Sequence, residues 1–286
     1  MPEVLDKKNV RKVFRDVQKH LAIAQLIRRF STNKEDIRKT ALNHVDLSGC
    51  KNVLELGCAF GAFTEALKDR LHPEATITGI DIIPEYKLFF LDACRRAGYH
   101  GTFSSSGIEQ IVKYSSNSYD LVICSYALYF FPQMIPEIAR ILKKDGFFIT
   151  ITHSREDMRE MVGIVKNILK QNNAPDHDKQ LPIEIIFDQF SAEKGKSLLQ
   201  PFFGKVQSID FKNTLVFQPH EMDHFLDYFQ FKKSFFLMET EANNKNIAHQ
   251  LLKELQDTAM KKNFVTMCKD DRIFICSNPI KPEEAK

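Results

Sequence analysis

Residues 51–67 (Lys-Asn-Val-Leu-Glu-Leu-Gly-Cys-Ala-Phe-Gly-Ala-Phe-Thr-Glu-Ala-Leu) constrain the fold of this chain more than any other segment. They predict a short buried strand, a tight loop from Gly57 to Gly61, and an amphipathic helix. A second strand-like run, residues 75–81, ends on Asp81 about twenty residues past the loop. This order is typical of a mononucleotide site in a doubly wound α/β sheet. In such sites glycines let the backbone approach the ligand, and the acid holds ribose hydroxyls.

The spacing within the loop narrows the choice of ligand. Dinucleotide sites use Gly-x-Gly-x-x-Gly, because a pyrophosphate must lie on the helix N-terminus. Here the pattern is Glu55-x-Gly57-x-x-x-Gly61, with Ala59 and Ala62 where that fingerprint has its other glycines. The pattern resembles motif I of the class I S-adenosylmethionine-dependent methyltransferases, acid-x-Gly-x-Gly-x-Gly. Taken alone, the segment is also compatible with a plain β-turn-α connection that binds nothing.

From residue 50 onward, strand-like and helix-like segments alternate regularly. Strands are expected at 51–56, 75–81, 99–104, 119–125, 147–152 and 272–276, and helices at 60–71, 84–97, from 107, and up to 142. Such alternation requires parallel pairing with right-handed crossovers. The predicted fold is therefore α/β, with a Rossmann-like, doubly wound, mostly parallel sheet. The resemblance implies seven strands, with strand seven antiparallel, and helical cap or lid insertions.

The remaining segments predict helices around this sheet. Residues 6–30 have a basic amphipathic helical pattern, and a second helix is expected at Thr32, where Thr-x-x-Glu resembles a capping box. Many phenylalanines after residue 180 predict either an aromatic-lined pocket or plain core packing. The predicted domains are an N-terminal helical cap (1–48), the methyltransferase domain (49–278) with cap insertions at about 153–190 and 219–262, and a tail (279–286).

Three further segments resemble the same family in their order. Residues 120–131 resemble motif IV with its loop, and residues 142–150 resemble the Leu-Lys-Pro-Gly-Gly segment, with Lys-Asp in place of Pro-Gly. Residues 104–108 occupy the position where relatives place an adenine-reading Asp, which this chain lacks. The run from Cys124 to Ala127 is not the Asn-Pro-Pro-Tyr type that acts on nucleobase or glutamine amino groups. The resemblance thus favours the small-molecule, type 11 branch.

The resemblance implies a binding site for S-adenosylmethionine, with S-adenosylhomocysteine as the product. In open α/β sheets this site lies beyond the carboxyl ends of the strands. The expected cofactor-binding residues are Glu55, Gly57, Cys58, Ala59 and Gly61 at the methionine end, Asp81 with Ile82 at the ribose, Ser106, Gly107 and Ile108 near the adenine, and Cys124 at the end of the fourth strand.

Methyl transfer is an in-line displacement that requires alignment of donor and acceptor, and removal of a proton where the acceptor carries one. His153, just past the fifth strand, is the candidate general base, because its reference pKa is near neutrality. The alternative is a polar residue that caps the segment beginning at Ser154. Tyr126 is the candidate for the acceptor pocket, together with Tyr129, and simple packing is the alternative for both. The acceptor is expected to be a small molecule that offers oxygen, nitrogen or a carboxylate.

His220-Glu-Met-Asp-His224 matches the His-Glu-x-x-His pattern of zinc proteases. Against this interpretation, Asp223 puts a charge where such helices are apolar, and Pro219 immediately precedes the motif. We therefore expect a surface helix that begins at Pro219, and no metal.

Net charge and composition limit the classes of partner that this chain is expected to have. A formal net charge of +3 requires neither nucleic acid nor an anionic membrane. The six cysteines show no Cys-x-x-Cys spacing and are expected to be small buried hydrophobes in a reducing cytosol. No run is apolar enough to span a bilayer, so a cytoplasmic protein is expected. Two alternatives stay open, a non-catalytic S-adenosylmethionine-binding protein and an RNA-directed methyltransferase that uses the basic N-terminal helix. The sequence does not indicate an oligomeric state.

Overall fold

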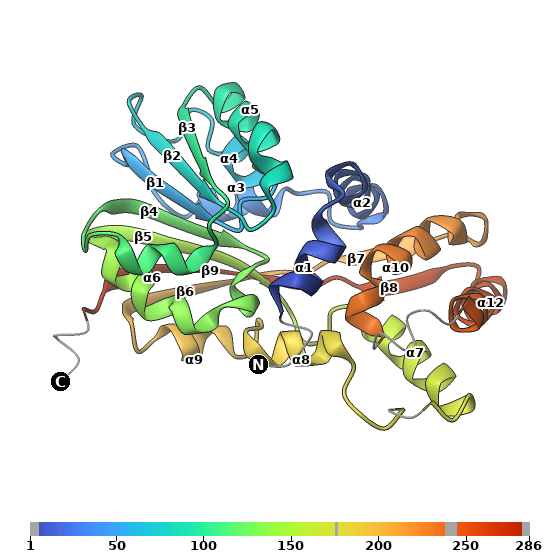
Figure 1. Cartoon of the computed structure of the whole chain (residues 1–286). Helices are drawn as coiled ribbons and strands as arrows, with labels where there is room; N and C mark the ends of the chain where they lie inside the picture. The colour runs from blue at the N-terminus through green and yellow to red at the C-terminus, as the bar shows by residue number, and fades with distance from the viewer. Residues whose placement is uncertain (1–5, 175–176, 238–244, 282–286) are drawn as a thin grey trace. The chain divides into compact units, whose positions relative to one another are not determined.

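The structure, a computed structural model, describes residues 6–174, 177–237 and 245–281 (Figure 1). The chain forms two compact units, and each unit is built from separate stretches of sequence. Unit 1 comprises Met1–Lys34, Ser154–Asp188 and Lys212–Asp270, and unit 2 comprises Glu35–His153, Gln189–Phe211 and Asp271–Lys286. The predicted division into a cap and a catalytic domain stays a prediction, because compact units are defined by contacts and not by function. Residues 282–286 of the predicted tail lie outside the described residues.

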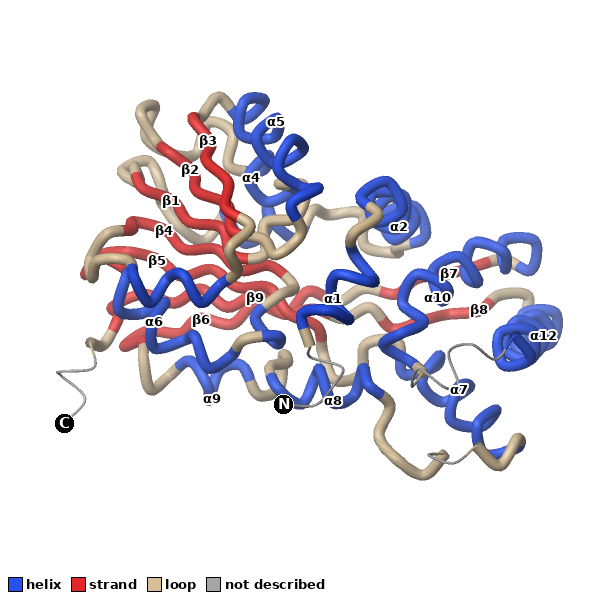
Figure 2. Tube along the Cα trace, in the orientation of Figure 1, coloured by secondary structure: helices blue, strands red, loops and turns tan. Residues whose placement is uncertain are grey.

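Unit 2 contains a seven-stranded sheet of order β3-β2-β1-β4-β5-β9-β6 (Figure 2). Its strands are β1 (Asn52–Leu56), β2 (Thr76–Ile80), β3 (His100–Ser104), β4 (Tyr119–Ser125), β5 (Leu142–His153), β6 (Phe203–Phe211) and β9 (Asp271–Pro279). The first five strands pair in parallel, and β9 runs antiparallel to both β5 and β6. The predicted Rossmann-like sheet with one antiparallel strand, the last in the chain, is confirmed.

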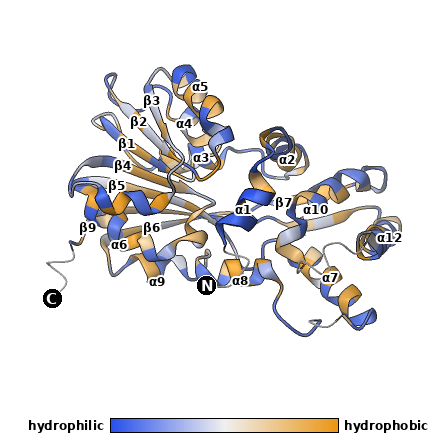
Figure 3. Cartoon of the chain, in the orientation of Figure 1, coloured by the Kyte–Doolittle hydropathy of each residue, from blue (hydrophilic) through white to orange (hydrophobic). Residues whose placement is uncertain are grey.

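The faces of this sheet follow from the alternation of side chains along each strand. Val53, Ile77 and Ile123 share one buried cluster with Phe63 and Phe90. This face is covered by α3 (Ile37–Leu42), α4 (Ala62–Ala66) and α5 (Lys87–Ala97), whereas α6 (Ile135–Ile141) and α9 (Gly195–Leu199) pack against β5, β6 and β9 (Figure 1). Figure 3 shows both hydrophobic and hydrophilic colour on α6, the pattern of a helix with one buried side.

Two local predictions in unit 2 are wrong. The helix expected at 60–71 is shorter, because α4 ends at Ala66 and the chain continues in turns. The strand expected at 147–152 begins earlier, because residues 143–146 already lie within β5, where the register against β4 shifts next to Tyr119. There the Lys143 ammonium donates to Asp120 Oδ1 at 2.7 Å. This pairing across the two strands favours a bulge over the reversal that Asp-Gly usually indicates.

Unit 1 consists of helices and a two-stranded antiparallel sheet, β7 (Thr214–Phe217) with β8 (Val265–Cys268). Its helices are α1 (Lys7–Phe14), α2 (Val17–Phe30), α7 (Arg159–Gln171), α8 (Pro182–Gln189), α10 (Met222–Phe236) and α12 (Lys245–Lys262). Within the described residues, no helix is sufficiently long and apolar to cross a membrane.

The N-terminal helices differ from the prediction in two places. The single helix expected over residues 6–30 is interrupted, because Asp16 accepts a hydrogen bond from the Lys19 backbone at 3.0 Å and starts α2 as a new helix. No helix starts at Thr32, whose backbone N–H instead donates to the Thr214 carbonyl at 2.8 Å. In unit 2, α3 begins after Asp36, which is its N-cap residue.

The phenylalanines of unit 1 form its core. Phe217, Phe225, Phe229 and Phe236 are each at most 1% exposed. Phe217 and Phe225 meet edge to face, with ring centroids 5.4 Å apart, a favoured geometry for aromatic pairs. Of the two explanations for the aromatic composition, core packing is the one that accounts for these residues.

Candidate cofactor and acceptor site

The loop between β1 and α4 requires glycine at two positions. Gly57 and Gly61 have φ angles of 67° and 79°, in the left-handed region. A Cβ atom at Gly57 would lie 2.6 Å from the Ala127 Cβ, and one at Gly61 would lie 2.6 Å from the Ala93 Cβ. Ala59 also has a positive φ, of 44°, so the loop holds a non-glycine residue in a conformation that costs free energy.

Asp81 fastens this loop to the end of β2. Its Oδ2 accepts a hydrogen bond from the Ala59 backbone N–H at 2.9 Å, and its Oδ1 accepts one from the Ile83 N–H at 3.0 Å. Burial raises the pKa of Asp81 to about 6, while these backbone donors oppose the shift. The structure thus brings together Asp81 and Ala59, two of the predicted cofactor-binding residues. Ile82, a third, lies directly between Asp81 and Ile83 in the chain.

Glu55 has a buried carboxyl and lies on the face of β1 that α3, α4 and α5 cover, the same face as Val53. The Thr64 hydroxyl on α4 donates to its Oε2 at 2.5 Å. Burial raises the pKa of Glu55 to about 7, and the Thr64 hydrogen bond and the positive charge of Arg38 lower it again. Such a perturbed carboxyl beside a glycine loop is typical of functional sites.

Arg38, at the start of α3, was missed by the sequence interpretation. Its Nε and Nη2 donate to the two oxygens of Asp36 at 2.8 and 2.9 Å, a fork that fixes the guanidinium plane. Among the described residues its Nη1 has no hydrogen-bond partner. The spacing of Asp36 and Arg38 is typical of a helix start and could have indicated Arg38. The sequence interpretation placed the helix start at Thr32 instead.

The loop after β3 contains the residues expected near adenine. Gly107 has a φ of 86°, Ile108 is buried, and Ser106 is exposed. Gln110, a second residue that the sequence interpretation missed, holds the loop in shape. Its Nε2 donates to the Gly107 carbonyl at 2.8 Å, and its Oε1 accepts from the Ser104 hydroxyl at 3.0 Å. The Asp81 N–H donates to the Ser104 carbonyl at 3.1 Å, so this loop adjoins the ribose-binding candidate.

His153 and Tyr126, the candidates for catalysis, converge on a third side chain. His153 is paired in register with Asp271 of β9, and its Nδ1 lies 2.7 Å from Asp271 Oδ1. The Tyr126 hydroxyl donates to Asp271 Oδ2 at 2.7 Å. The rings of Tyr126 and His153 are stacked, with centroids 4.6 Å apart, and the Tyr129 ring lies 6.2 Å from that of His153. Asp271 is 118 residues from His153 in sequence, and no local pattern links the two.

Cysteines at the site serve as small apolar side chains. Cys124, at the carboxyl end of β4, is 0% exposed, and Cys58 in the glycine loop is 2% exposed. Burial raises the pKa of both thiols well above the usual range, so neither is a thiolate at neutral pH. The six cysteines are buried and form no disulfide, in agreement with the prediction that they pack as small hydrophobes.

The His-Glu-x-x-His segment does not have the geometry of a zinc helix. His220 lies in a 3-10 turn (Pro219–Glu221), whereas His224 lies in α10, so the two do not occupy successive turns of one α-helix. Glu221 accepts a hydrogen bond from the Gln218 N–H at 3.0 Å in a capping box. The ring of His224 packs on Phe30, with centroids 5.5 Å apart. These contacts explain the segment as a helix start, and the absence of a metal there stays a prediction.

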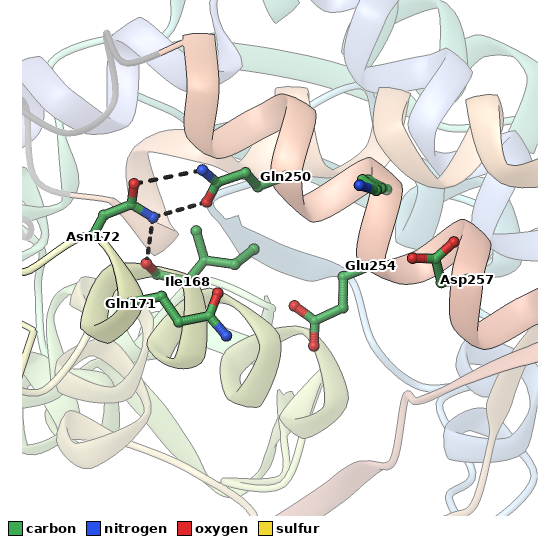
Figure 4. A pocket seen from close by; sticks show the side chains of 7 residues that line it. Ile168, Gln171, Asn172, Gln250, Glu254 and Asp257 are labelled. Atoms are coloured by element: carbon green, nitrogen blue, oxygen red, sulfur yellow. Dashed lines mark hydrogen bonds between the residues drawn. The ribbon is translucent and has the colours of Figure 1, made fainter.

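Unit 1 contains a cavity of about 410 Å³ along α7 and α12. It is lined by Ile168, Gln171, Asn172, Gln250, Lys253, Glu254 and Asp257 (Figure 4). Asn172 Nδ2 donates to Gln250 Oε1 and to the Ile168 carbonyl, both at 2.8 Å, as the figure shows. None of the residues predicted to bind cofactor or acceptor lines this cavity, and no motif of the sequence falls in it.

Comparisons with known proteins agree with this geometry. Residues 54–150 match the type 11 family model described as a methyltransferase domain. The YcgJ protein of Bacillus subtilis superimposes with a TM-score of 0.53 at 16% identity, over 84% of this chain and 97% of that one. A Bacillus halodurans protein described as a candidate methyltransferase gives a TM-score of 0.52 at 12% identity, over 85% of this chain and 98% of that one.

At these identities the solved structures establish the fold alone. No curated protein matches this chain by sequence. The fold and the family model together confirm the predicted resemblance: the chain has the fold of the class I S-adenosylmethionine-dependent methyltransferases, and residues 54–150 match the family model of a methyltransferase domain.

Proposed function

We propose that this protein transfers a methyl group from S-adenosylmethionine to a small-molecule acceptor. The observation that carries the proposal is the hydrogen bond from the Ala59 N–H to Asp81 Oδ2, 2.9 Å long. It joins the glycine loop to the acid at the tip of β2, so the two elements expected to contact the methionine part and the ribose of one cofactor molecule are held together. A plain β-turn-α connection would have no need for this link.

The side chains present fit the chemical groups of S-adenosylmethionine. Asp81 offers carboxylate oxygens to ribose hydroxyls, and Glu55 offers a negative charge for the amino group of the methionine part. Arg38 offers Nη1 for the carboxylate of that part, a use for which the planar guanidinium is well suited. The left-handed glycines at positions 57 and 61 let the loop pack closely against Ala127 and Ala93, where a Cβ atom would collide, and so fix the path of the loop backbone. When bound, the cofactor supplies an already activated methyl group.

The remaining predicted residues have supporting roles in this proposal. Cys58, Gly107, Ile108 and Cys124 are buried and would form apolar walls. Ser106 is exposed at the adenine end, where it would offer its hydroxyl in place of the missing Asp. The protein's own contribution to the reaction is then to bind, orient and desolvate, which is sufficient for much of a displacement at an activated methyl group.

Calorimetry with S-adenosylmethionine and S-adenosylhomocysteine tests the cofactor site. We expect Asp81→Asn to weaken binding about 10- to 100-fold, because one hydrogen bond to a charged group is worth roughly 1.5–3 kcal/mol. The matched control is Asp270→Asn, because Asp270 in unit 1 also accepts a backbone hydrogen bond, from Asn213 at 3.0 Å. It should leave affinity unchanged. No heat of binding at millimolar ligand, or equal affinity for Asp81→Asn and wild type, would contradict the proposal.

Transfer itself is tested with methyl-labelled S-adenosylmethionine and a protein-free metabolite extract. Label in a small-molecule product supports the proposed reaction. Tight binding without transfer would instead favour the non-catalytic alternative. The RNA-directed alternative predicts label in RNA, together with salt-dependent binding that is lost when Lys7, Lys8, Arg11 and Lys12 of the N-terminal segment are neutralised.

A further inference from the structure

Three side chains from separate strand ends meet within unit 2. Tyr126 follows β4, His153 ends β5, and Asp271 begins β9. Each oxygen of the Asp271 carboxylate has a partner, His153 Nδ1 at Oδ1 and the Tyr126 hydroxyl at Oδ2, both at 2.7 Å. Distances this short are typical of hydrogen bonds to an ionised acceptor. Because β4 and β5 are parallel, both ends lie at the carboxyl edge of the sheet, where open α/β sheets bind ligands.

The arrangement is held in place on several sides. His153 and Asp271 are each 8% exposed, and Tyr126 stacks on the imidazole at an interplanar angle of 28°. The backbone of Tyr126 has a φ of 55°, a conformation that non-glycine residues rarely adopt. Strain of this kind persists where the surroundings fix the residue, and it concentrates at functional sites. The Tyr126 N–H also donates to the Ile151 carbonyl at 2.9 Å, which anchors the strained residue to β5.

The chemistry of the imidazole follows from these bonds. A carboxylate can only accept, so the hydrogen bond at Oδ1 places a proton on Nδ1 of His153. In the neutral ring, Nε2 is then the nitrogen that accepts a proton. A carboxylate behind Nδ1 also stabilises the imidazolium that forms when Nε2 is protonated, which is its role in hydrolase triads.

We infer that Asp271 and Tyr126 position His153 as a general base, and that the methyl acceptor is therefore a hydroxyl or an amine rather than a carboxylate. This inference rests on the proposed function. The lone pair of the acceptor oxygen or nitrogen forms the new bond to the methyl carbon, and the carbon–sulfur bond breaks with its electron pair on sulfur. The acceptor proton passes to His153 Nε2. A carboxylate acceptor is ionised at neutral pH and has no proton to lose, so it would leave this base without a task.

The stability of the labelled product to alkali tests the acceptor class without knowledge of the acceptor. Methyl esters hydrolyse in mild alkali and release labelled methanol, which is volatile, whereas methyl ethers and methylamines do not. We expect alkali to release no labelled methanol from the product that wild-type protein forms in an extract. Labelled methanol released by alkali would overturn the assignment of a hydroxyl or amine acceptor.

Substitution of Asp271 tests the positioning. At saturating S-adenosylmethionine, Asp271→Asn should lower the transfer rate about 10²- to 10⁴-fold, since an amide no longer fixes the tautomer. The KM for S-adenosylmethionine and the calorimetric affinity should stay unchanged. Tyr126→Phe should have a smaller effect, about 10-fold, and Asp271→Glu should restore part of the rate. The matched control is Asp210→Asn, because Asp210 also meets β9, where Arg272 Nε donates to it at 2.6 Å.

Nitrogen-15 spectra of the imidazoles report which ring nitrogen of His153 is protonated. If Asp271 were only structural, its substitution would not change this protonation and the transfer rate together. His153→Gln assigns the His153 signals. We expect a protonated Nδ1 and an unprotonated Nε2 in the wild type, and a loss of that preference in Asp271→Asn. An unchanged tautomer together with an unchanged rate in Asp271→Asn would overturn the inference. Failure of the proposed function looks different, because it shows as absent cofactor binding and no transferred label in the wild type.

Discussion

The two units of this chain bury their charged groups in different ways. In unit 2, Glu55 and Asp81 are buried acids whose hydrogen-bond donors include a threonine hydroxyl and backbone N–H groups, and burial raises the pKa of both. In unit 1, the Asp157 carboxylate is paired with the Lys269 ammonium at 2.9 and 3.0 Å, with side chains 0% and 5% exposed. A buried acid without a cation is costly to ionise. Unit 1 thus compensates the charge of its buried acid with an ion pair of its own, whereas hydrogen-bond donors and the more distant charge of Arg38 act on the buried acids of unit 2.

The largest effect should come from breaking the buried pair of unit 1. Lys269→Met leaves the Asp157 carboxylate buried without its ammonium, and we expect a loss of about 3–5 kcal/mol in the free energy of unfolding. The matched control is Lys166→Met, because Lys166 pairs with Glu184 at 2.8 Å with side chains 37% and 28% exposed. That pair should be worth about 0–1 kcal/mol. Urea titrations of both variants make the measurement, and equal losses would contradict the contrast drawn between buried and exposed pairs.

One glycine from each unit gives the next contrast. Gly61→Ala places a Cβ atom 2.6 Å from the Ala93 Cβ at a φ of 79°, and we expect about 1–3 kcal/mol of destabilisation together with weaker cofactor binding. Gly163 lies in α7, where a Cβ atom would have no neighbouring atom within 4 Å. Gly163→Ala should therefore stabilise the protein, by about 0.5–1 kcal/mol, and leave binding alone. Thermal melts and calorimetry check both, and effects of the same sign would refute the comparison.

The two units should respond to pH in opposite directions. The raised pKa of Glu55, about 7, means that its contribution to stability is present below its unfolded value and is lost as pH rises through 7. In unit 1, burial lowers the pKa of His20 to about 3, helped by the nearby charge of Lys232. A neutral buried His20 stabilises above its ordinary pKa of about 6.5, and that contribution is lost as pH falls below it.

Thermal melts of the ligand-free protein from pH 5 to pH 8 test these signs. Glu55→Gln should be more stable than the wild type at pH 8, by an amount on the order of 2 kcal/mol, and lose that advantage near pH 5. His20→Gln should behave in the reverse manner, with its relative stability greatest at pH 5. A pH-independent difference in either variant would show that the residue does not titrate on unfolding in this range.

The smallest effect concerns the segment that resembles a zinc site. Glu221→Ala removes the capping-box acceptor for the Gln218 N–H, and we expect a loss of about 0.3–1.5 kcal/mol. His220→Ala, on an exposed turn, should change neither stability nor bound metal. Metal analysis of the purified protein together with urea titration provides the check. Stoichiometric zinc that disappears in His220→Ala would show that the helix-start explanation is wrong.

The sequence predicted those parts of the molecule that depend on short-range spacing. The alternation of strands and helices follows from local patterns, and so does the position of Asp81 at the edge that holds the glycine loop, because parallel strands bring their carboxyl ends to one edge. Asp271 could not be predicted, since its partnership with His153 is set by the register of β5 against β9. Arg38 was not predicted, because the capping-box pattern at Thr32 indicated a different helix start. In the structure the Thr32 N–H donates to the Thr214 carbonyl, and no capping box forms there. Unit 1 combines three distant stretches whose aromatic packing has no local signature.

The position of β9 has a consequence for biosynthesis. This strand lies between β5 and β6 and pairs with both, yet it follows every other strand of the sheet in the chain. On the ribosome, β5 and β6 therefore have unpaired edges until residues 271–279 emerge, and exposed edges invite association with other chains. A premature stop before Asp271 would leave β6 detached from the sheet and His153 without its carboxylate. The same late strand thus both covers the free edge of β5 and brings Asp271 to His153.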